Sequence, residues 1–155
     1  MTDSLAQLIE RLEAAEGGSR ELDAAVFKAL DPHGFSLATR QEMVLMPKGA
    51  TIGDAVRRVR APAPYTQSLD AALALVEEKL PGAAIEMSIW QKSKDDLSAT
   101  CWARLMLTHT GEDGKLWHHH SDGRSEAEAS TLPLALIIAL LKSIQHKEQS
   151  DDSSL

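Results

Sequence analysis

A run of consecutive histidines, residues 118–120, is the group of side chains in this sequence best suited to hold a metal ion. If the run lies in a β-strand, His118 and His120 share one face, so both imidazoles can reach the same ion. His109 and Asp122 lie at either end of the same expected hairpin and could complete the ligand shell. Zinc, however, needs three or four ligands aimed at one point, and no His-Glu-x-x-His helix is present. A polar strand end whose histidines are satisfied by backbone or water is therefore favoured over a metal site.

Three tryptophans, Trp90, Trp102 and Trp117, fall in three expected strands. Alternation places Trp90 and Trp102 on the face opposite the most apolar residues, together with Met106. If helices cover both faces, these indoles are core or half-buried. If they do not, the indoles form an exposed platform for a protein partner or a stacking ligand. Because four expected helices are available to cover the sheet, core or partial burial is predicted.

The one basic cluster of the chain is formed by Arg57, Arg58 and Arg60, and it could bind an anion. Arginines near the end of a short helix are also expected from the helix dipole, and such side chains are usually solvated. Neither a Walker pattern nor Gly-x-Gly-x-x-Gly occurs, which excludes nucleotide hydrolysis by the common route.

Nucleophilic and acid–base chemistry finds no support among the remaining residues. The chain has no Gly-x-Ser-x-Gly elbow. Its lone cysteine, Cys101, alternates with apolar residues in an expected strand, which is typical of a small buried hydrophobe. Glu86 and Arg104 are expected to pair across the sheet in a structural role. The sequence therefore predicts neither an enzyme nor a bound cofactor.

Length and composition are those of one folded domain: 155 residues, 43% hydrophobic and 25% charged. The formal charge of −7 at pH 7 disfavours general nucleic-acid binding. A single cysteine excludes an internal disulfide and fits a reducing cytosol. No secretory signal is recognisable at the start, and no apolar run is long enough to cross a membrane. We therefore expect a cytoplasmic protein.

Hydrophobic spacing predicts an α+β fold with an N-terminal αα-hairpin, residues 5–15 and 19–30, of which Ser4 and Ser19 cap the two helices. Residues 68–80 form a third helix and the segment after Thr131 forms the last. Between these two helices lies a three-stranded antiparallel sheet, with helices packed on both faces. Its strands are residues 84–91, 99–108 and 116–120. Residues 1–147 make a single domain with an irregular insertion at about 33–65, and 148–155 are a flexible tail.

Several local strings resemble one family of small phage and prophage proteins. They are residues 5–15 (LAQLIERLEAA), 18–23 (GSRELD), 64–72 (PYTQSLDAA) and 132–136 (LPLAL). The chain resembles proteins that carry the phage ABA sandwich domain, and the likeness covers nearly its whole length. It implies a small sheet sandwiched by helices, and no catalytic residues come with it.

The leading hypothesis is a non-enzymatic accessory protein of phage or prophage origin that binds a macromolecular partner in the cytoplasm of a bacterial host. An anti-defence inhibitor, which binds a host defence protein, is one version of this role. Candidate contact residues are the three arginines and the three tryptophans above. Two alternatives stay open. One is a small metal-dependent enzyme built on His118 and His120, and the other is a self-associating structural protein with a symmetric homodimer interface.

Overall fold

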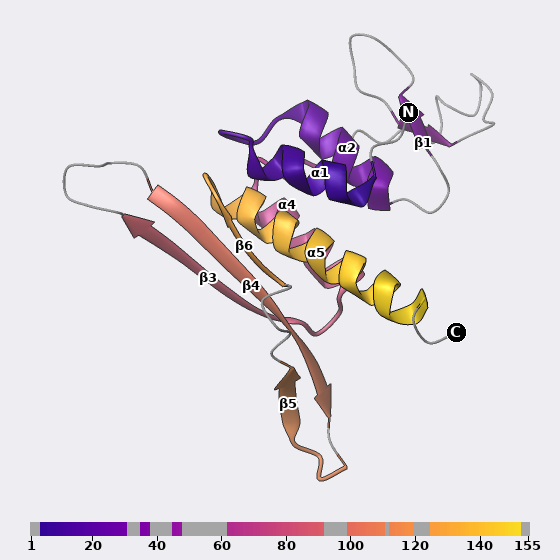
Figure 1. Ribbon diagram of the computed structural model, residues 1–155, viewed down its shortest axis with the longest axis vertical. Helices are drawn as coiled ribbons and strands as arrows, with labels where there is room; N and C mark the ends of the chain where they lie inside the picture. Colours follow the sequence, from indigo (N-terminus) through magenta and orange to yellow (C-terminus); the bar gives the residue numbers. More distant parts are fainter. Residues whose placement is uncertain are drawn as a thin grey trace.

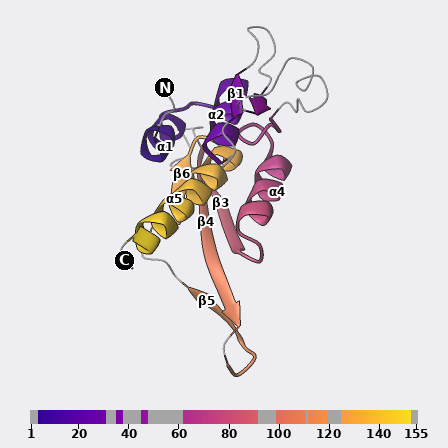
Figure 2. The same cartoon turned by 90° about the vertical axis from the view of Figure 1, so that its right-hand side faces the viewer.

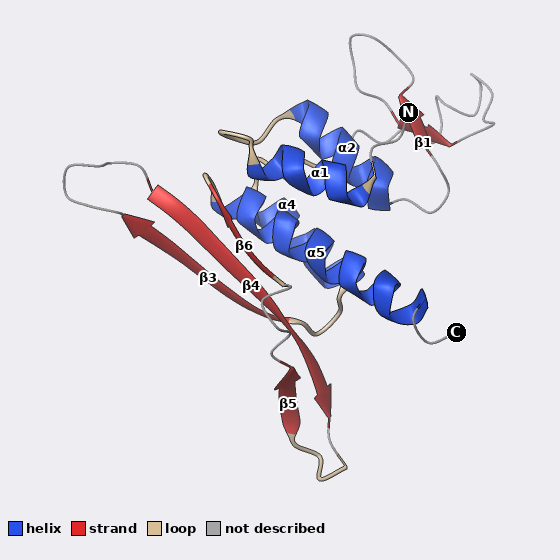
Figure 3. Ribbon diagram, viewed as in Figure 1, coloured by secondary structure: helices blue, strands red, loops and turns tan. Residues whose placement is uncertain are grey.

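The computed structural model describes residues 4–30, 35–37, 45–47, 62–91, 99–110, 112–119 and 125–152; of residues 35–37, 45–47, 91, 99, 107–110, 116–119 and 150 it describes the backbone alone. Helices and strands are mixed along the chain, which confirms the α+β class (Figure 3). In chain order the elements are α1 (Leu5–Glu13), α2 (Arg20–Leu30), β1 (Phe35–Leu37), β2 (Leu45–Pro47), α4 (Leu69–Lys79), β3 (Ala84–Gln91), β4 (Ala99–Thr110), β5 (Leu116–His119), β6 (Glu126–Ala129) and α5 (Leu132–Asp152).

The sheet is antiparallel and is built around the long strand β4. On one side β4 pairs with β3 over eight consecutive residue pairs, and residues 101–104 also pair with β6. The last four residues of β4 pair with β5, and this ribbon projects away from the helices (Figures 1 and 2). The three predicted strands are thereby confirmed. β6 lies in a polar stretch for which no strand was predicted, because its sequence, Glu-Ala-Glu-Ala, is poor in strand-forming residues.

The segment expected to be an irregular insertion, 33–65, is described at three places. Within it β1 and β2 form a short antiparallel pair in which Ser36 lies opposite Met46. Residues 62–65 lead into α4. The rest of the segment, including the arginine cluster, lies outside the described residues.

Polar side chains begin each helix where the sequence predicts them. Ser4 and Gln7 form a reciprocal capping box at α1. The Ser19 hydroxyl accepts the N–H of Leu22 at the start of α2, and Ser68 Oγ accepts the N–H of Ala71 in α4. Each cap satisfies a backbone donor that the helix itself leaves free. The N-terminal αα-hairpin is thus formed by α1 and α2 (Figure 1).

The centre of the core is the helix α5, not the sheet. Every residue from 134 to 141 has 0% exposure, so this part of the helix is buried on all sides. β4 and β6 pack against one side of α5, while α1 and α4 pack against the others. A helix that is apolar all round needs neighbours all round. The apolar run of 132–141 is the sequence signal for that arrangement.

The prediction that helices pack on both faces of the sheet is wrong for the described elements. α1, α2, α4 and α5 all lie on one side, with α5 against the strands and the others beyond it (Figures 1 and 2). The physical reason is that α5 itself requires covering: α1 and α4 pack against α5, and α2 packs against α1. Within the described part of the chain no helix remains for the opposite face.

A buried carboxylate joins the αα-hairpin to the segment before α4. Asp23 is fully buried; its Oδ1 accepts the N–H of Thr66 at 2.7 Å and the Thr66 hydroxyl at 2.6 Å. Its Oδ2 accepts Gln67 Nε2 at 2.7 Å, and the N–H of Ser19 donates to Thr66 Oγ1. Gly18 lies so close that a Cβ there would be 2.0 Å from the Thr66 carbonyl oxygen. We call these five residues the clasp. They belong to two of the strings on which the family resemblance rests.

The last helix is longer than the sequence predicted. α5 continues to Asp152, so residues 148–152 are helical where a flexible tail was expected, and 153–155 lie outside the described residues. Good helix formers, Lys147, Glu148 and Gln149, carry the helix past the buried part, and no glycine or proline follows Pro133 to end it. Among the described helices, none has an apolar stretch of the length that crossing a bilayer requires.

Candidate protein-binding face of the sheet

The side of the sheet that faces away from α5 carries polar and aromatic side chains in rows across three strands. Along β4, Cys101, Ala103 and Leu105 are buried toward α5, so Trp102 and Arg104 point to the other side. The pairing registers add residues of β3 and β6 to the same side. We call this the outer face, and its residues are Glu86, Ser88, Trp90, Trp102, Arg104, Glu126 and Glu128.

Arg104 is the centre of one row across the outer face. Its register partners are Glu86 on β3 and Glu126 on β6. Arg104 Nε donates to Glu126 Oε1 at 2.6 Å, and a second guanidinium nitrogen contacts the same carboxylate. The remaining nitrogen, Nη1, lies 3.5 Å from Glu86 Oε2. The predicted pair with Glu86 is confirmed. The closer partner, Glu126, was missed because β6 was not predicted.

The next row combines Ser88, Trp102 and Glu128. The guanidinium carbon of Arg104 lies 5.0 Å from the centroid of the Trp102 ring, within the range of a cation–π contact. The carboxylates of Glu86 and Glu126 contact the guanidinium and favour its placement beside Trp102. Such preorganisation lowers the entropy lost on binding.

The tryptophans differ in burial. Trp102 is half-buried, as predicted, but Trp90 is 64% exposed, and for Trp90 the prediction of burial is wrong. The reason is the one-sided arrangement of the helices, which leaves the outer face open. Trp117 lies in β5, and its side chain is outside the described part.

Exposed large hydrophobic side chains concentrate on β3. Among the described residues they are Met87, Ile89 and Trp90, with exposures of 36%, 59% and 64%. Met87 and Ile89 lie opposite Ala103 and Cys101, so they belong to the side of the sheet that faces α5. The helices do not extend far enough to cover them. The sequence shows the alternation along this strand, but it carries no signal for where the helical cover stops.

The histidine cluster is only partly described. In the β4–β5 ribbon His109 lies opposite Trp117 and His118 lies opposite Thr108. Opposed residues share a face and successive pairs alternate, so His109 and His118 occupy positions of opposite faces. His120 and Asp122 lie outside the described residues. Within the described residues no group of three or more metal-ligating side chains converges.

Cys101 behaves as the sequence predicts. It is 5% exposed, and burial raises the pKa of its thiol. Its sulfur lies 3.8 Å from the Ser130 carbonyl oxygen, to which it can donate. A buried thiol with a raised pKa forms little thiolate at neutral pH, so it is a poor nucleophile.

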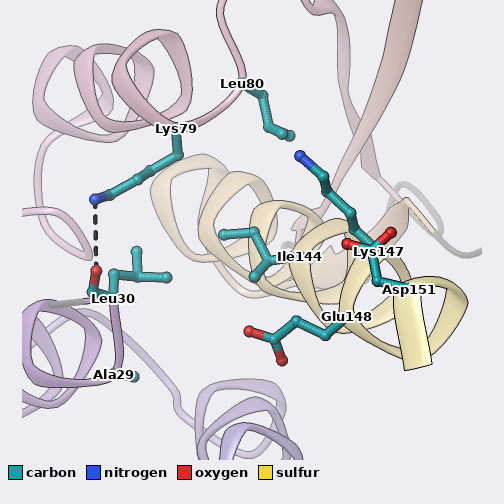
Figure 4. Close-up of a pocket in the computed structure, with 8 residues that line it drawn as sticks. All are labelled: Ala29, Leu30, Lys79, Leu80, Ile144, Lys147, Glu148 and Asp151. Atoms are coloured by element: carbon teal, nitrogen blue, oxygen red, sulfur yellow. Dashed lines mark hydrogen bonds between the residues drawn. The ribbon is translucent and has the colours of Figure 1, made fainter. Parts of the chain in front are cut away.

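A pocket of about 420 Å³ lies where the C-terminal ends of α2 and α4 meet the second half of α5 (Figure 4). Leu30, Leu80 and Ile144 supply apolar surface. Lys79 extends across to α2, where its Nζ donates to the Leu30 carbonyl oxygen at 3.4 Å. That bond satisfies a carbonyl at the end of α2, so it acts as a helix cap. The other lining residues are Ala29, Lys147, Glu148 and Asp151.

The charged side chains that line this pocket are balanced. Its two lysines are matched by two carboxylates, and its lining includes no nucleophilic hydroxyl, thiol or imidazole. Sequence reasoning did not find it because the lining comes from three elements distant in the chain.

Comparison of the chain with models of protein families, with curated proteins and with solved structures finds no match. The described elements define an α+β domain whose helices all lie on one side of the sheet.

Proposed function

We propose that this chain is a non-enzymatic protein-binding module whose contact surface is the outer face. The observation that carries the proposal is an aromatic surface that none of the described helices covers, on which Trp90 is 64% exposed and Trp102 lies beside the Arg104 guanidinium. Tryptophan and arginine are the residue types most enriched among those that dominate binding energy at protein interfaces. Uncovered apolar surface bordered by polar residues is typical of such interfaces.

The charges on the outer face favour a partner of particular chemistry. Of the residues that define the outer face, Glu86, Glu126 and Glu128 are acidic and Arg104 is basic, so their summed charge is negative. The whole chain is also negative, with a formal charge of −7. Such a surface attracts a basic protein and repels an acidic one, and it raises the rate of encounter at low salt. We therefore infer a protein partner with apolar and basic residues at its contact surface.

The resemblance to phage ABA sandwich proteins supports the biological part of the proposal. On that basis the chain is an accessory protein of phage or prophage origin that acts on a host protein in the bacterial cytoplasm. Inhibition of a host defence protein is one form of such a role. It requires stoichiometric binding and no turnover.

Capture from a lysate of the bacterial host, with quantification of bound proteins, tests the proposal. The informative variant is Glu128→Arg, because Glu128 is exposed on the outer face. The matched control is Glu77→Arg, which makes the same charge change at an exposed position of α4 on the other side of the molecule. We expect one stoichiometric protein whose affinity falls by about tenfold or more with Glu128→Arg and is unchanged with Glu77→Arg. Equal loss in both variants, or no captured protein, contradicts the proposal.

A further inference from the structure

We propose that two copies of this chain join through their β3 strands, in an antiparallel pair around a two-fold axis at Ser88. The inference goes beyond the proposed function because it concerns the edge of the sheet and not its outer face. In the resulting dimer the outer faces of the two copies continue across the axis as one surface.

The two edges of the sheet differ in how they are protected. In the described part of the chain β3 pairs with β4 alone, so its other edge is free over eight residues. The β3 sequence, Ala-Ile-Glu-Met-Ser-Ile-Trp-Gln, has no lysine, proline or glycine, and its register with β4 has no bulge. Lysine, proline and bulges are features by which proteins prevent edge strands from pairing, and β3 has none of them. β6, by contrast, has four residues and two glutamates.

The exposed apolar side chains mark the same edge. Met87, Ile89 and Trp90 lie within four residues of one another on β3. The only charged side chain of the strand, Glu86, already pairs with Arg104. The β3 edge therefore brings neither a net repulsion nor a protective charge to a second β3, although each whole chain is acidic.

The direction of the free backbone groups restricts the register. The N–H of Leu105 donates to the Ser125 carbonyl oxygen at 3.0 Å, so the polar groups of Leu105 point away from β3. Ile85 lies opposite Leu105, and its own N–H and C=O must therefore point to the free edge. By alternation Met87, Ile89 and Gln91 do the same. The centre of these four edge-facing residues is Ser88, so a two-fold axis there pairs all of them.

This register is also chemically matched. Met87 of one copy lies opposite Ile89 of the second copy, which joins the two exposed side chains on the side facing α5. Glu86 lies opposite Trp90 of the second copy, so no two carboxylates are opposed. Ser88 lies opposite Ser88 of the second copy. Serine is small and uncharged, so two opposed Ser88 residues bring neither bulk nor charge to the axis.

The first experiment measures the mass of the full chain in solution by light scattering and sedimentation over a range of concentrations. We expect about twice the 16.8 kDa of one chain. Ile89→Lys places a charge on the free edge at an exposed position and is expected to halve the mass. Ala74→Lys adds the same charge at an exposed position of α4 and is expected to leave the mass unchanged. Circular dichroism and unfolding curves verify that both variants are folded.

The second experiment tests the register by oxidation. Ser88 is a non-hydrogen-bonded position in the proposed pair, where opposed Cα atoms are about 4.5 Å apart, a distance that a disulfide can span. Ser88→Cys is therefore expected to form a covalent dimer. Glu128→Cys, on β6, and the unsubstituted chain, whose Cys101 is buried, are expected to stay monomeric on a denaturing non-reducing gel.

A monomer at every concentration, a dimer insensitive to Ile89→Lys, or equal oxidation of the two cysteine variants overturns the inference. The inference is also overturned if the chain is monomeric and Ile89 contacts a different protein. Failure of the proposed function is distinguishable, because Glu128→Arg affects partner capture without changing the mass of the dimer.

Discussion

The clasp and the β3 edge differ in two respects: whether their buried polar groups have hydrogen-bond partners, and whether they expose large apolar side chains. In the clasp both oxygens of the buried Asp23 carboxylate accept hydrogen bonds from Thr66 and Gln67. At β3 the buried Ser88 hydroxyl has no partner in the described part of the chain, and three large hydrophobic side chains are exposed. Both regions are short, and both lie within the same domain.

We infer that the clasp contributes to the stability of the single chain, whereas the β3 edge is available for contact with another chain. Hydrogen bonds to both oxygens offset the desolvation penalty of a buried carboxylate, and they favour one arrangement of the elements around it. Exposed apolar side chains and a free strand edge contribute little to the stability of one chain, but they are available to a partner. We therefore expect substitutions in the clasp to change folding and substitutions at β3 to change association.

The largest effect is expected for Asp23→Ala. The substitution leaves the buried N–H of Thr66 without an acceptor, while the Thr66 hydroxyl can turn to the Ser19 carbonyl at 3.2 Å and the amide of the exposed Gln67 can turn to water. One buried donor left unpaired costs about 1–3 kcal/mol, and the hydrogen bonds to a charged carboxylate are lost as well, so we expect the free energy of unfolding in urea to fall by about 2–4 kcal/mol. Glu21→Ala, an exposed carboxylate in the same helix turn, is the control and is expected to change stability by less than about 0.5 kcal/mol.

Gly18→Ala is expected to have the next largest effect. Its new Cβ would lie 2.0 Å from the Thr66 carbonyl oxygen, so the backbone of one segment must move and the clasp must lengthen its hydrogen bonds. Overpacking of this kind costs about 1–3 kcal/mol. The adjacent Gly17 has nothing within 4 Å of such a Cβ, so Gly17→Ala is expected to be neutral or slightly stabilising in the same unfolding measurement. Equal losses in the two variants would show that the contact with Thr66 is unimportant.

Trp90→Thr is expected to change the stability of the single chain by no more than about 0.5 kcal/mol, because 64% of the tryptophan is already exposed and threonine is a good strand former. Urea unfolding in the Ile89→Lys background, in which self-association is prevented, isolates this effect. A loss as large as that of Asp23→Ala would remove the distinction between the two regions, since it would make Trp90 part of the core.

The smallest effect concerns the only tyrosine of the chain, which adjoins the clasp. Burial raises the pKa of Tyr65 above its ordinary value of 10.0, and the nearby carboxylates of Glu78 and Asp23 raise it further. The unfolded chain therefore ionises first, so the stability contributed by the neutral phenol is constant below about pH 10 and is lost as the pH rises above it. Ultraviolet titration is expected to show a midpoint above that of the chain in urea. Tyr65→Phe is expected to weaken the alkaline loss of stability, and an identical alkaline loss would contradict the assignment.

Local features of the fold could be predicted because they depend on residues close in the sequence. The caps Ser4 and Ser68 lie three residues before the donors they accept, and the strand alternation places Trp102 and Arg104 on one side. The Glu86–Arg104 pair follows from the hairpin of two predicted strands. These patterns have periods of two or three to four residues, which a single sequence displays directly.

Features of the candidate site that join distant segments could not be predicted in the same way. Glu126 reaches Arg104 only because β6, whose sequence indicates no strand, pairs with β4. The exposure of Trp90 and Ile89 depends on where α5 and its surrounding helices stop covering the sheet. From the sequence, Asp23 is expected to be an exposed acidic residue in the first turn of a helix. Its burial depends on Thr66, which lies 43 residues away.

The sequence by itself determined the α+β class, the order of most elements, their caps and the parity of the strands, because short-range hydrogen bonding and side-chain periodicity set these. The tertiary structure alone decided which face of the sheet stays open, that α5 and not the sheet is the centre of the core, and which polar groups are satisfied. The physical reason is that burial is a property of neighbours. A helix that is apolar on all sides packs against several neighbours, and among the described elements the face of the sheet without a helix carries Trp90 and Trp102.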